Sequence, residues 1–333
     1  MNSRWKPSAV LASVIFVLSL VAVLVPIGAV QAECGSGATR LQGSVKLKSS
    51  TPGYIDQLYV GLISVVTLED DQEYQGWLVA PDGSKLNVGV LTIDKLSETA
   101  GQAIVMEIDP AFGNIVYTYT HPSGLNLMSQ GYNKFMITIE SISDSDPEPS
   151  ATIAYADAIP LDALEYIRML LYSAEVAPVL TSGAHKGVSK GIVVGLYEQA
   201  DLALDHATLA ANSTSLDDVK LHTQHVINII EGTQGDSYDS SSQDPGDGFG
   251  LIPYARKAIE YAKAAAIVHP DRLTLSRFEP DVSEPATNAE TWATMSLDKA
   301  FESLKATDLT AAQAYMEEAK TYLSWAVSGH DID

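Results

Sequence analysis

The stretch Asp144–Pro149, with the sequence DSDPEP, divides the chain into two parts with different hydrophobic periodicities. Before it, apolar and polar residues alternate, as in Phe135–Glu140 (FMITIE), and a period of two is typical of half-buried antiparallel strands. Beyond Pro160, apolar residues recur every three or four positions, which is typical of amphipathic helices. The sequence therefore predicts an α+β multidomain fold, with an N-terminal antiparallel β-sandwich over residues 41–159 and an α-helical bundle over residues 160–330.

Seven or eight short strands are expected in the first part. The run Ile115–Tyr119 alternates in the same way as Phe135–Glu140, and the turn formers Pro81–Gly83 and Pro122–Gly124 separate such runs. So many short strands in about 120 residues favour an Ig-like sandwich over a barrel.

Part of this predicted sandwich resembles a known family. The stretch Tyr74–Gly83 (YQGWLVAPDG), followed by Val88–Leu91 (VGVL), is similar to the extracytoplasmic C-terminal domain of anti-sigma-K factors. The later stretch Phe135–Ser150 resembles the closing hairpin of that domain. The resemblance covers about residues 41–159 and implies an extracytoplasmic β-sandwich. Because only eight residues precede the apolar N-terminal run, we expect no sigma-binding domain and no sigma factor binding by this chain.

The N-terminus has the pattern of a secretory signal. Arg4 and Lys6 precede the apolar run Ala9–Val25, and small residues follow, which predicts a signal peptide over residues 1–32 with cleavage after Ala32. An uncleaved membrane anchor is the alternative, because about 17 apolar residues reach the lower limit for spanning a bilayer. Both interpretations place the rest of the chain outside the cytoplasm, either secreted or tethered at the outer face of the cytoplasmic membrane.

Residues 33–40 form a predicted short linker that contains Cys34, the only cysteine. A single cysteine cannot close an intrachain disulfide. The net charge is −22, from 20 Lys and Arg against 42 Asp and Glu. Nucleic-acid binding is excluded because it requires a basic surface, and membrane contact is expected only through an uncleaved signal segment.

Five or six helices are expected in the second part. They cover Leu161–Ala174, about 185–211, a helix from Ser215 to near Gly232, Ile252–Val268, about 290–305 and Leu309–Val327. Ser215 and Asp218 resemble a capping box with Asp in place of Glu. Mostly short connections indicate a bundle, interrupted by an acidic loop over residues 233–250.

Three of the seven histidines fall within one stretch of twenty residues in this predicted bundle: His206, His222 and His225. His206 and His222 are each eight positions from Thr214, at the centre of the turn between their helices, so an antiparallel hairpin places them at one level. His225 lies one helical turn from His222. Imidazoles from facing helices are suited to Zn, Cu, Ni or Fe. The alternative is structural packing, with hydrogen bonds to Tyr197, Asn228, Tyr254, Tyr261 or water.

The acidic loop offers a second candidate site. It carries the four aspartates Asp236, Asp239, Asp244 and Asp247 among Ser and Gly. Oxygen ligands of this kind suit Ca²⁺, which takes six to eight of them, although the spacing is not that of an EF-hand. An ordinary solvated loop has the same composition.

Three classes of function fit these observations. The first is an extracytoplasmic binding or sensor-type protein without catalysis, whose bundle holds a metal through the histidines and whose partner is an unidentified protein or small ligand. The second is a metal-dependent extracytoplasmic enzyme, and the third is a structural adhesion module of the cell surface. No HExxH, Walker or dinucleotide-binding motif occurs in the sequence, and no catalytic residues are assigned.

Overall fold

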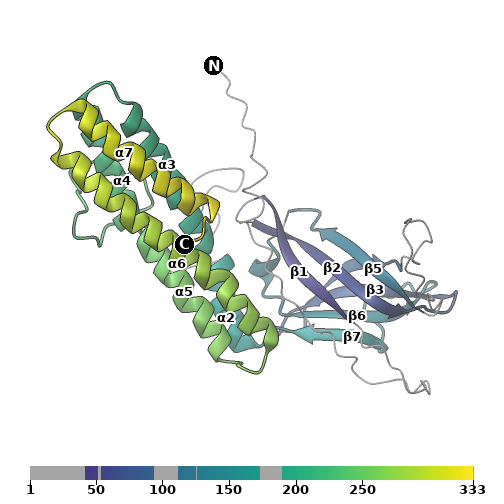
Figure 1. The fold of residues 1–333 in the computed structure, drawn as a ribbon. Coiled ribbons are helices and arrows are strands. Elements are labelled where there is room, and N and C mark those ends of the chain that lie inside the picture. The colour runs from purple at the N-terminus through teal and green to yellow at the C-terminus, as the bar shows by residue number, and fades with distance from the viewer. Residues whose placement is uncertain (1–41, 52–53, 94–111, 125, 173–189, 333) are drawn as a thin grey trace, which may run out of the picture. The chain divides into compact units, whose positions relative to one another are not determined.

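The computed structural model describes residues 42–51, 54–93, 112–124, 126–172 and 190–332 (Figure 1). It confirms the predicted fold class, because β-sheets come first and a helical bundle follows. The main division between two compact units falls between Leu164 and Glu165. The predicted signal segment 1–32 and the linker with Cys34 lie outside the described residues. Within the described ranges, no helix is long and apolar enough to cross a membrane.

Seven strands of the described chain form two sheets. They are β1 (Gln42–Thr51), β2 (Tyr54–Val66), β3 (Gln72–Val79), β4 (Lys85–Leu91), β5 (Phe112–Thr120), β6 (Lys134–Ser141) and β7 (Ile153–Ala158). One sheet has the order β1-β2-β5 and the other the order β4-β3-β6-β7. The pairs β2–β5, β3–β4, β3–β6 and β6–β7 are all antiparallel. A single 3₁₀ turn, η1 (Leu127–Gln130), precedes β6.

The two sheets face one another across an apolar core. Leu47 and Leu58 of the first sheet and Leu78 and Phe135 of the second line one small cavity, together with Leu127. All of these side chains are buried. The alternation along the strands therefore has the expected cause, since one face of each sheet fills a common interior.

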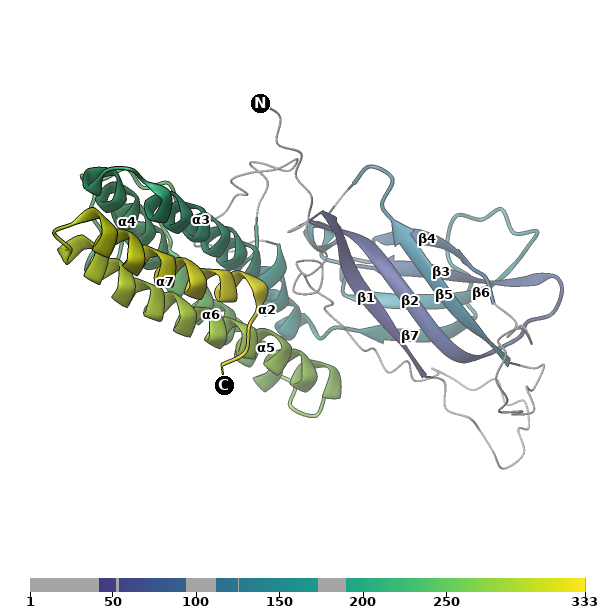
Figure 2. The same ribbon diagram turned by 45° about the horizontal axis from the view of Figure 1, so that its top comes forward.

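Six helices follow in the described chain. They are α2 (Leu161–Leu171), α3 (Ile192–Asn212), α4 (Leu216–Glu231), α5 (Leu251–Ile267), α6 (Leu273–Lys305) and α7 (Leu309–Ser328). Figures 1 and 2 show α3 to α7 running lengthwise beside one another. Helix α3 packs against α4, α5 and α7. From Ala200 onward its buried residues are all alanines, with Ala200, Ala203, Ala207 and Ala210 at spacings of three and four, which permits close approach of the neighbouring helices.

The turn between α3 and α4 is fixed by the predicted cap. Ser215 accepts a hydrogen bond from the backbone N–H of Asp218 at 3.1 Å, and its hydroxyl donates to the Asp218 carboxylate at 2.7 Å. Such a cap satisfies a backbone donor that the first turn of α4 leaves free. The start of α4, and with it the register of the two helices, is thereby defined.

Helix α6 differs from the prediction. It begins at Leu273, whereas the sequence suggested a start near Glu290. Pro280 and Pro285 lie inside the helix, and proline normally interrupts a helix because it lacks an N–H and clashes with the preceding turn. The helix continues because it carries an apolar stripe at helical spacing, which is buried: Phe278, Val282, Ala286 and Ala289.

Candidate metal centre

The hairpin of α3 and α4 brings the three predicted histidines together. His206 comes from α3, and His222 and His225 come from α4. His225 is buried, and the other two are half-buried. One ligand atom from each ring lies within 4.8 Å of those of the other two, and within the described ranges no other group of three His, Cys, Asp or Glu side chains does so. The prediction from the equal spacing of His206 and His222 on either side of Thr214 is therefore confirmed, since the histidines do lie together.

The Nδ1 atom of His206 is at the centre of this cluster. It lies 3.3 Å from Nδ1 of His222 and 3.3 Å from Nδ1 of His225. A neutral imidazole nitrogen carries one hydrogen or one lone pair, so it forms only one good hydrogen bond of this kind. The second contact must share the same hydrogen or lone pair and is therefore a weak hydrogen bond, whereas a cation between the nitrogens could use one lone pair from each ring.

The spacing fits a metal ion. Four ligands placed tetrahedrally at the usual Zn–N distance of about 2.0–2.1 Å lie about 3.3–3.4 Å from one another. The two separations from Nδ1 of His206, to Nδ1 of His222 and to Nδ1 of His225, have this value. The three rings also differ in orientation, with angles between ring planes of 44°, 84° and 79°, so they converge without stacking. The ligand atoms of the three histidines all lie within 4.8 Å of one another, so the group could hold a metal ion.

The electrostatic surroundings keep the rings of His206 and His225 neutral. Burial, and then the neighbouring rings of His225 and His222, lower the pKa of His206 to about 4. Burial and His222 also lower the pKa of His225, although the carboxylate of Asp244 acts in the opposite direction. Neutral imidazole is the state that binds metals, so neither ring must lose a proton at neutral pH before it can act as a ligand.

Two of the partners expected for a purely structural cluster, Asn228 and Tyr254, bond elsewhere. The amide of Asn228 bonds the backbone N–H and C=O of Asp239 at 2.9 and 3.0 Å, and the hydroxyl of Tyr254 donates to Asp247 at 2.7 Å. Tyr261 lies against the ring of Tyr166. In the described part of the chain, the ring nitrogens of the three histidines bond only to one another.

Comparison of the chain with family models, curated proteins and solved structures gives no match. The resemblance of residues 41–159 to the anti-sigma-K C-terminal domain stays a prediction. The function is therefore inferred from the side chains themselves.

The four aspartates of the acidic loop are not brought together. Asp236 is exposed, Asp239 accepts hydrogen bonds from the backbone and hydroxyl of Ser241, and Asp244 accepts from the N–H of Gly246 at 2.8 Å. No three of these carboxylates meet the ligand distances of a metal site. The calcium site expected from composition therefore has no common centre here, because Asp236 is exposed and the other three aspartates serve local turns or a distant partner.

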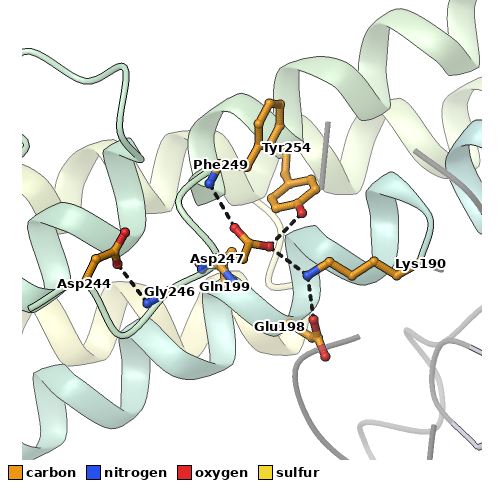
Figure 3. A network of polar contacts seen from close by, with 8 residues as sticks. All are labelled: Lys190, Glu198, Gln199, Asp244, Gly246, Asp247, Phe249 and Tyr254. Atoms are coloured by element: carbon orange, nitrogen blue, oxygen red, sulfur yellow. Dashed lines mark hydrogen bonds and ion pairs between the residues drawn. The ribbon is translucent and has the colours of Figure 1, made fainter. Parts of the chain in front are cut away.

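Asp247 is the aspartate of the loop that bonds to a residue distant in the sequence. Its carboxylate accepts hydrogen bonds from Nζ of Lys190 at 2.7 Å and from the hydroxyl of Tyr254 at 2.7 Å (Figure 3). Lys190 is fully buried and also pairs with Glu198 at 2.8 Å. Burial, and then the charge of Asp247, raise the pKa of Tyr254 strongly. This network ties the end of the acidic loop to the starts of α3 and α5.

Lys190 was not predicted as a functional residue from the sequence. One signal was present, because this lysine lies two residues before the apolar run Ile192–Val194, where a charge must be buried with partners or point away from the core. A second signal is Gly195, where an added Cβ would lie 2.2 Å from the Tyr254 ring. The glycine therefore makes room for the tyrosine that supports the ion pair.

Proposed function

We propose that this chain is an extracytoplasmic protein, secreted or tethered at the membrane surface, whose helical bundle binds a transition metal through Nδ1 of His206, His222 and His225. One observation carries the proposal: three imidazoles have ligand atoms within 4.8 Å of one another, with Nδ1 of His206 at 3.3 Å from Nδ1 of each of the other two, and they bond only to one another among the described residues. The low pKa of His206 supports it further, because protons then compete little with the metal near neutral pH.

Among the four candidate metals, the spacing favours Zn²⁺. Ligands at right angles, as in square-planar Cu²⁺ or octahedral Ni²⁺ and Fe²⁺ sites, would lie only about 2.8–3.0 Å apart at bond lengths near 2.0–2.1 Å. The observed 3.3 Å corresponds to tetrahedral angles, and zinc has no electronic preference against them.

The number of protein ligands points to an exchangeable position. Three histidines occupy three corners of a tetrahedron, and a fourth ligand completes it. His206 and His222 are half-buried, so water or a small ligand with an oxygen or nitrogen donor can reach the ion. We infer a binding or sensing role in which such a ligand occupies this position.

The test is metal binding by the purified full chain. Metal content after purification is measured by mass spectrometry, and the affinity of the stripped protein for Zn²⁺ by competition with a chromophoric chelator. We expect one Zn²⁺ per chain, and loss of this ion in His222→Gln and His225→Gln. His121→Gln is the matched control, because it removes a histidine in the sheet unit. No binding by the wild type, or equal binding by all variants, would contradict the proposal.

One observation also favours the enzyme alternative. Three protein ligands with an open fourth position are the arrangement of catalytic zinc sites, in which the metal lowers the pKa of bound water. The zinc-loaded chain is tested for hydrolysis of an activated ester, with His222→Gln as the blank. A rate that depends on both zinc and His222 would favour catalysis over binding alone.

A further inference from the structure

The acidic loop between α4 and α5 folds back over the side of α4 that carries His225. Nε2 of Gln224 donates to the C=O of Ser237 at 3.1 Å, and Asn228 bonds both backbone groups of Asp239. Farther along the loop, a Cβ placed at Gly246 would lie 3.5 Å from Cγ1 of Ile229. At about 100° per residue, His225 lies between Asn228 and Ile229 around the helix. The loop therefore crosses the face of α4 that carries His225, at the level of Asn228 and Ile229, about one helical turn from it.

Asp244 lies in the part of the loop that makes this crossing. The same Cβ at Gly246 would be 3.1 Å from Oδ1 of Asp244 and 2.6 Å from Oε1 of Gln199 on α3. Asp244 is thus held beside the seam between α3 and α4, about one helical turn from His225. Desolvation, and then the neighbouring carboxylate of Asp244, raise the pKa of Tyr238, which places Tyr238 beside Asp244 as a second support.

His225 has an unused nitrogen. Its Nδ1 faces His206 at 3.3 Å, whereas its Nε2 is buried and has no hydrogen-bond partner. A metal bound at Nδ1 takes the lone pair of that atom, so the neutral ring must carry its proton on Nε2. A buried N–H without an acceptor is unfavourable, and metal-ligating histidines almost always donate this second N–H to a carboxylate, carbonyl or water.

We propose that Asp244 is the carboxylate partner of His225 in the metal-bound protein, accepting the hydrogen bond of its Nε2–H and so fixing the ring for coordination through Nδ1. This inference rests on the metal centre proposed above. Asp244 is a positioning residue and does not touch the metal. The acidic loop then has a defined role, in which its Lys190–Asp247 pair and its bonds to Asn228 hold Asp244 over the hairpin.

The test compares Asp244→Asn with Asp236→Asn in the full chain. Both variants remove one negative charge from the same loop, but Asp236 is exposed, so they separate the specific hydrogen bond from general attraction of the cation. The loss of a partner of this kind typically weakens metal affinity about 10- to 100-fold. We expect a loss in this range for Asp244→Asn, a smaller loss for Tyr238→Phe, and an affinity within about twofold of wild type for Asp236→Asn.

Two further measurements separate a positioning role for Asp244 from direct ligation and from a loss of folding. The visible absorption of the Co²⁺-substituted protein reports the directly bound atoms, and we expect it to keep its tetrahedral bands in Asp244→Asn. The metal-free variant should melt like the wild type, because Asn retains the oxygen that accepts from Gly246.

Three results would overturn either the metal centre or the positioning role of Asp244, and they can be told apart. If the wild type binds Zn²⁺ and Asp244→Asn binds it as tightly as Asp236→Asn does, the role of Asp244 is refuted while the metal centre stands. A Co²⁺ spectrum altered in Asp244→Asn would make Asp244 a direct ligand and overturn the positioning role. A wild type that binds no metal refutes the metal centre itself.

Discussion

Nζ of Lys190 lies 2.7 Å from Oδ2 of Asp247, and the lysine side chain is completely buried although the two residues are 57 positions apart. The pair joins the start of α3 to the end of the acidic loop. Burying a charge is costly unless it is paired and hydrogen-bonded, and here Glu198 and Tyr254 complete the pairing. The position of the loop thus depends on a charge in the interior of the bundle.

Lys190→Met should destabilise the bundle strongly. The change leaves Glu198 and Asp247 without their common cation, and removing one partner of a buried ion pair typically costs about 3–5 kcal/mol. Urea unfolding measures the free energy. Lys257→Met is the control, because the Lys257–Glu260 pair is largely exposed and such pairs contribute about 0–1 kcal/mol. Equal losses in both variants would show that the buried network does not stabilise the fold.

The stability of the metal-free protein should depend on pH through His206. Its pKa is about 4 in the folded chain and near the ordinary value of about 6.5 in the unfolded chain. Between these values the unfolded state binds a proton that the folded state does not, so stability is full above about pH 6.5 and falls as the pH decreases towards 4. Unfolding is measured from pH 4 to 7 in wild type and His206→Gln. The variant should show the shallower dependence, and identical curves would contradict the low pKa.

Zinc should raise the melting temperature of the helical bundle. A ligand that binds only the folded state at 100 times its dissociation constant adds about 2.7 kcal/mol, which for a unit of this size raises the melting temperature by several degrees. Calorimetry of the full chain with Zn²⁺ and with a chelator measures the shift. His222→Gln should show none, and a shift of the same size in that variant would place the zinc elsewhere.

Asn228→Ala should release the acidic loop from α4. The Asn228 side chain is fully buried and bonds both backbone groups of Asp239, and groups left unpaired by its removal cost about 1–3 kcal/mol each if they remain buried. Limited proteolysis should cut residues 233–248 faster than in wild type. Gln243→Ala, a change at an exposed position of the same loop, is the comparison that should leave the rate unchanged.

Local patterns predicted much of this molecule. The change of period around Asp144–Pro149 predicted sheets followed by helices, because side-chain spacing follows directly from the geometry of each element. The convergence of His206 and His222 followed from their equal distance to a short turn. Both predictions depend only on neighbours along the chain or on one connection.

The rest depends on contacts between distant residues. The pairing of Lys190 with Asp247 requires the acidic loop to return across α3, and nothing in the local sequence of either residue specifies that path. The same holds for Pro280 and Pro285, where local preference indicates a break and the buried stripe from Phe278 to Ala289 maintains the helix. Tertiary packing outweighs propensity at such positions.

The α3–α4 hairpin supplies all three histidines, and His206 and His225 are only 19 positions apart. Closing so short a loop costs little chain entropy, and helical segments with local contacts fold fast. The cluster can therefore assemble as soon as this hairpin has formed, before α7 packs along α3. A metal captured at that moment would act on the folding pathway, nucleating the bundle while the C-terminal helices are still being added.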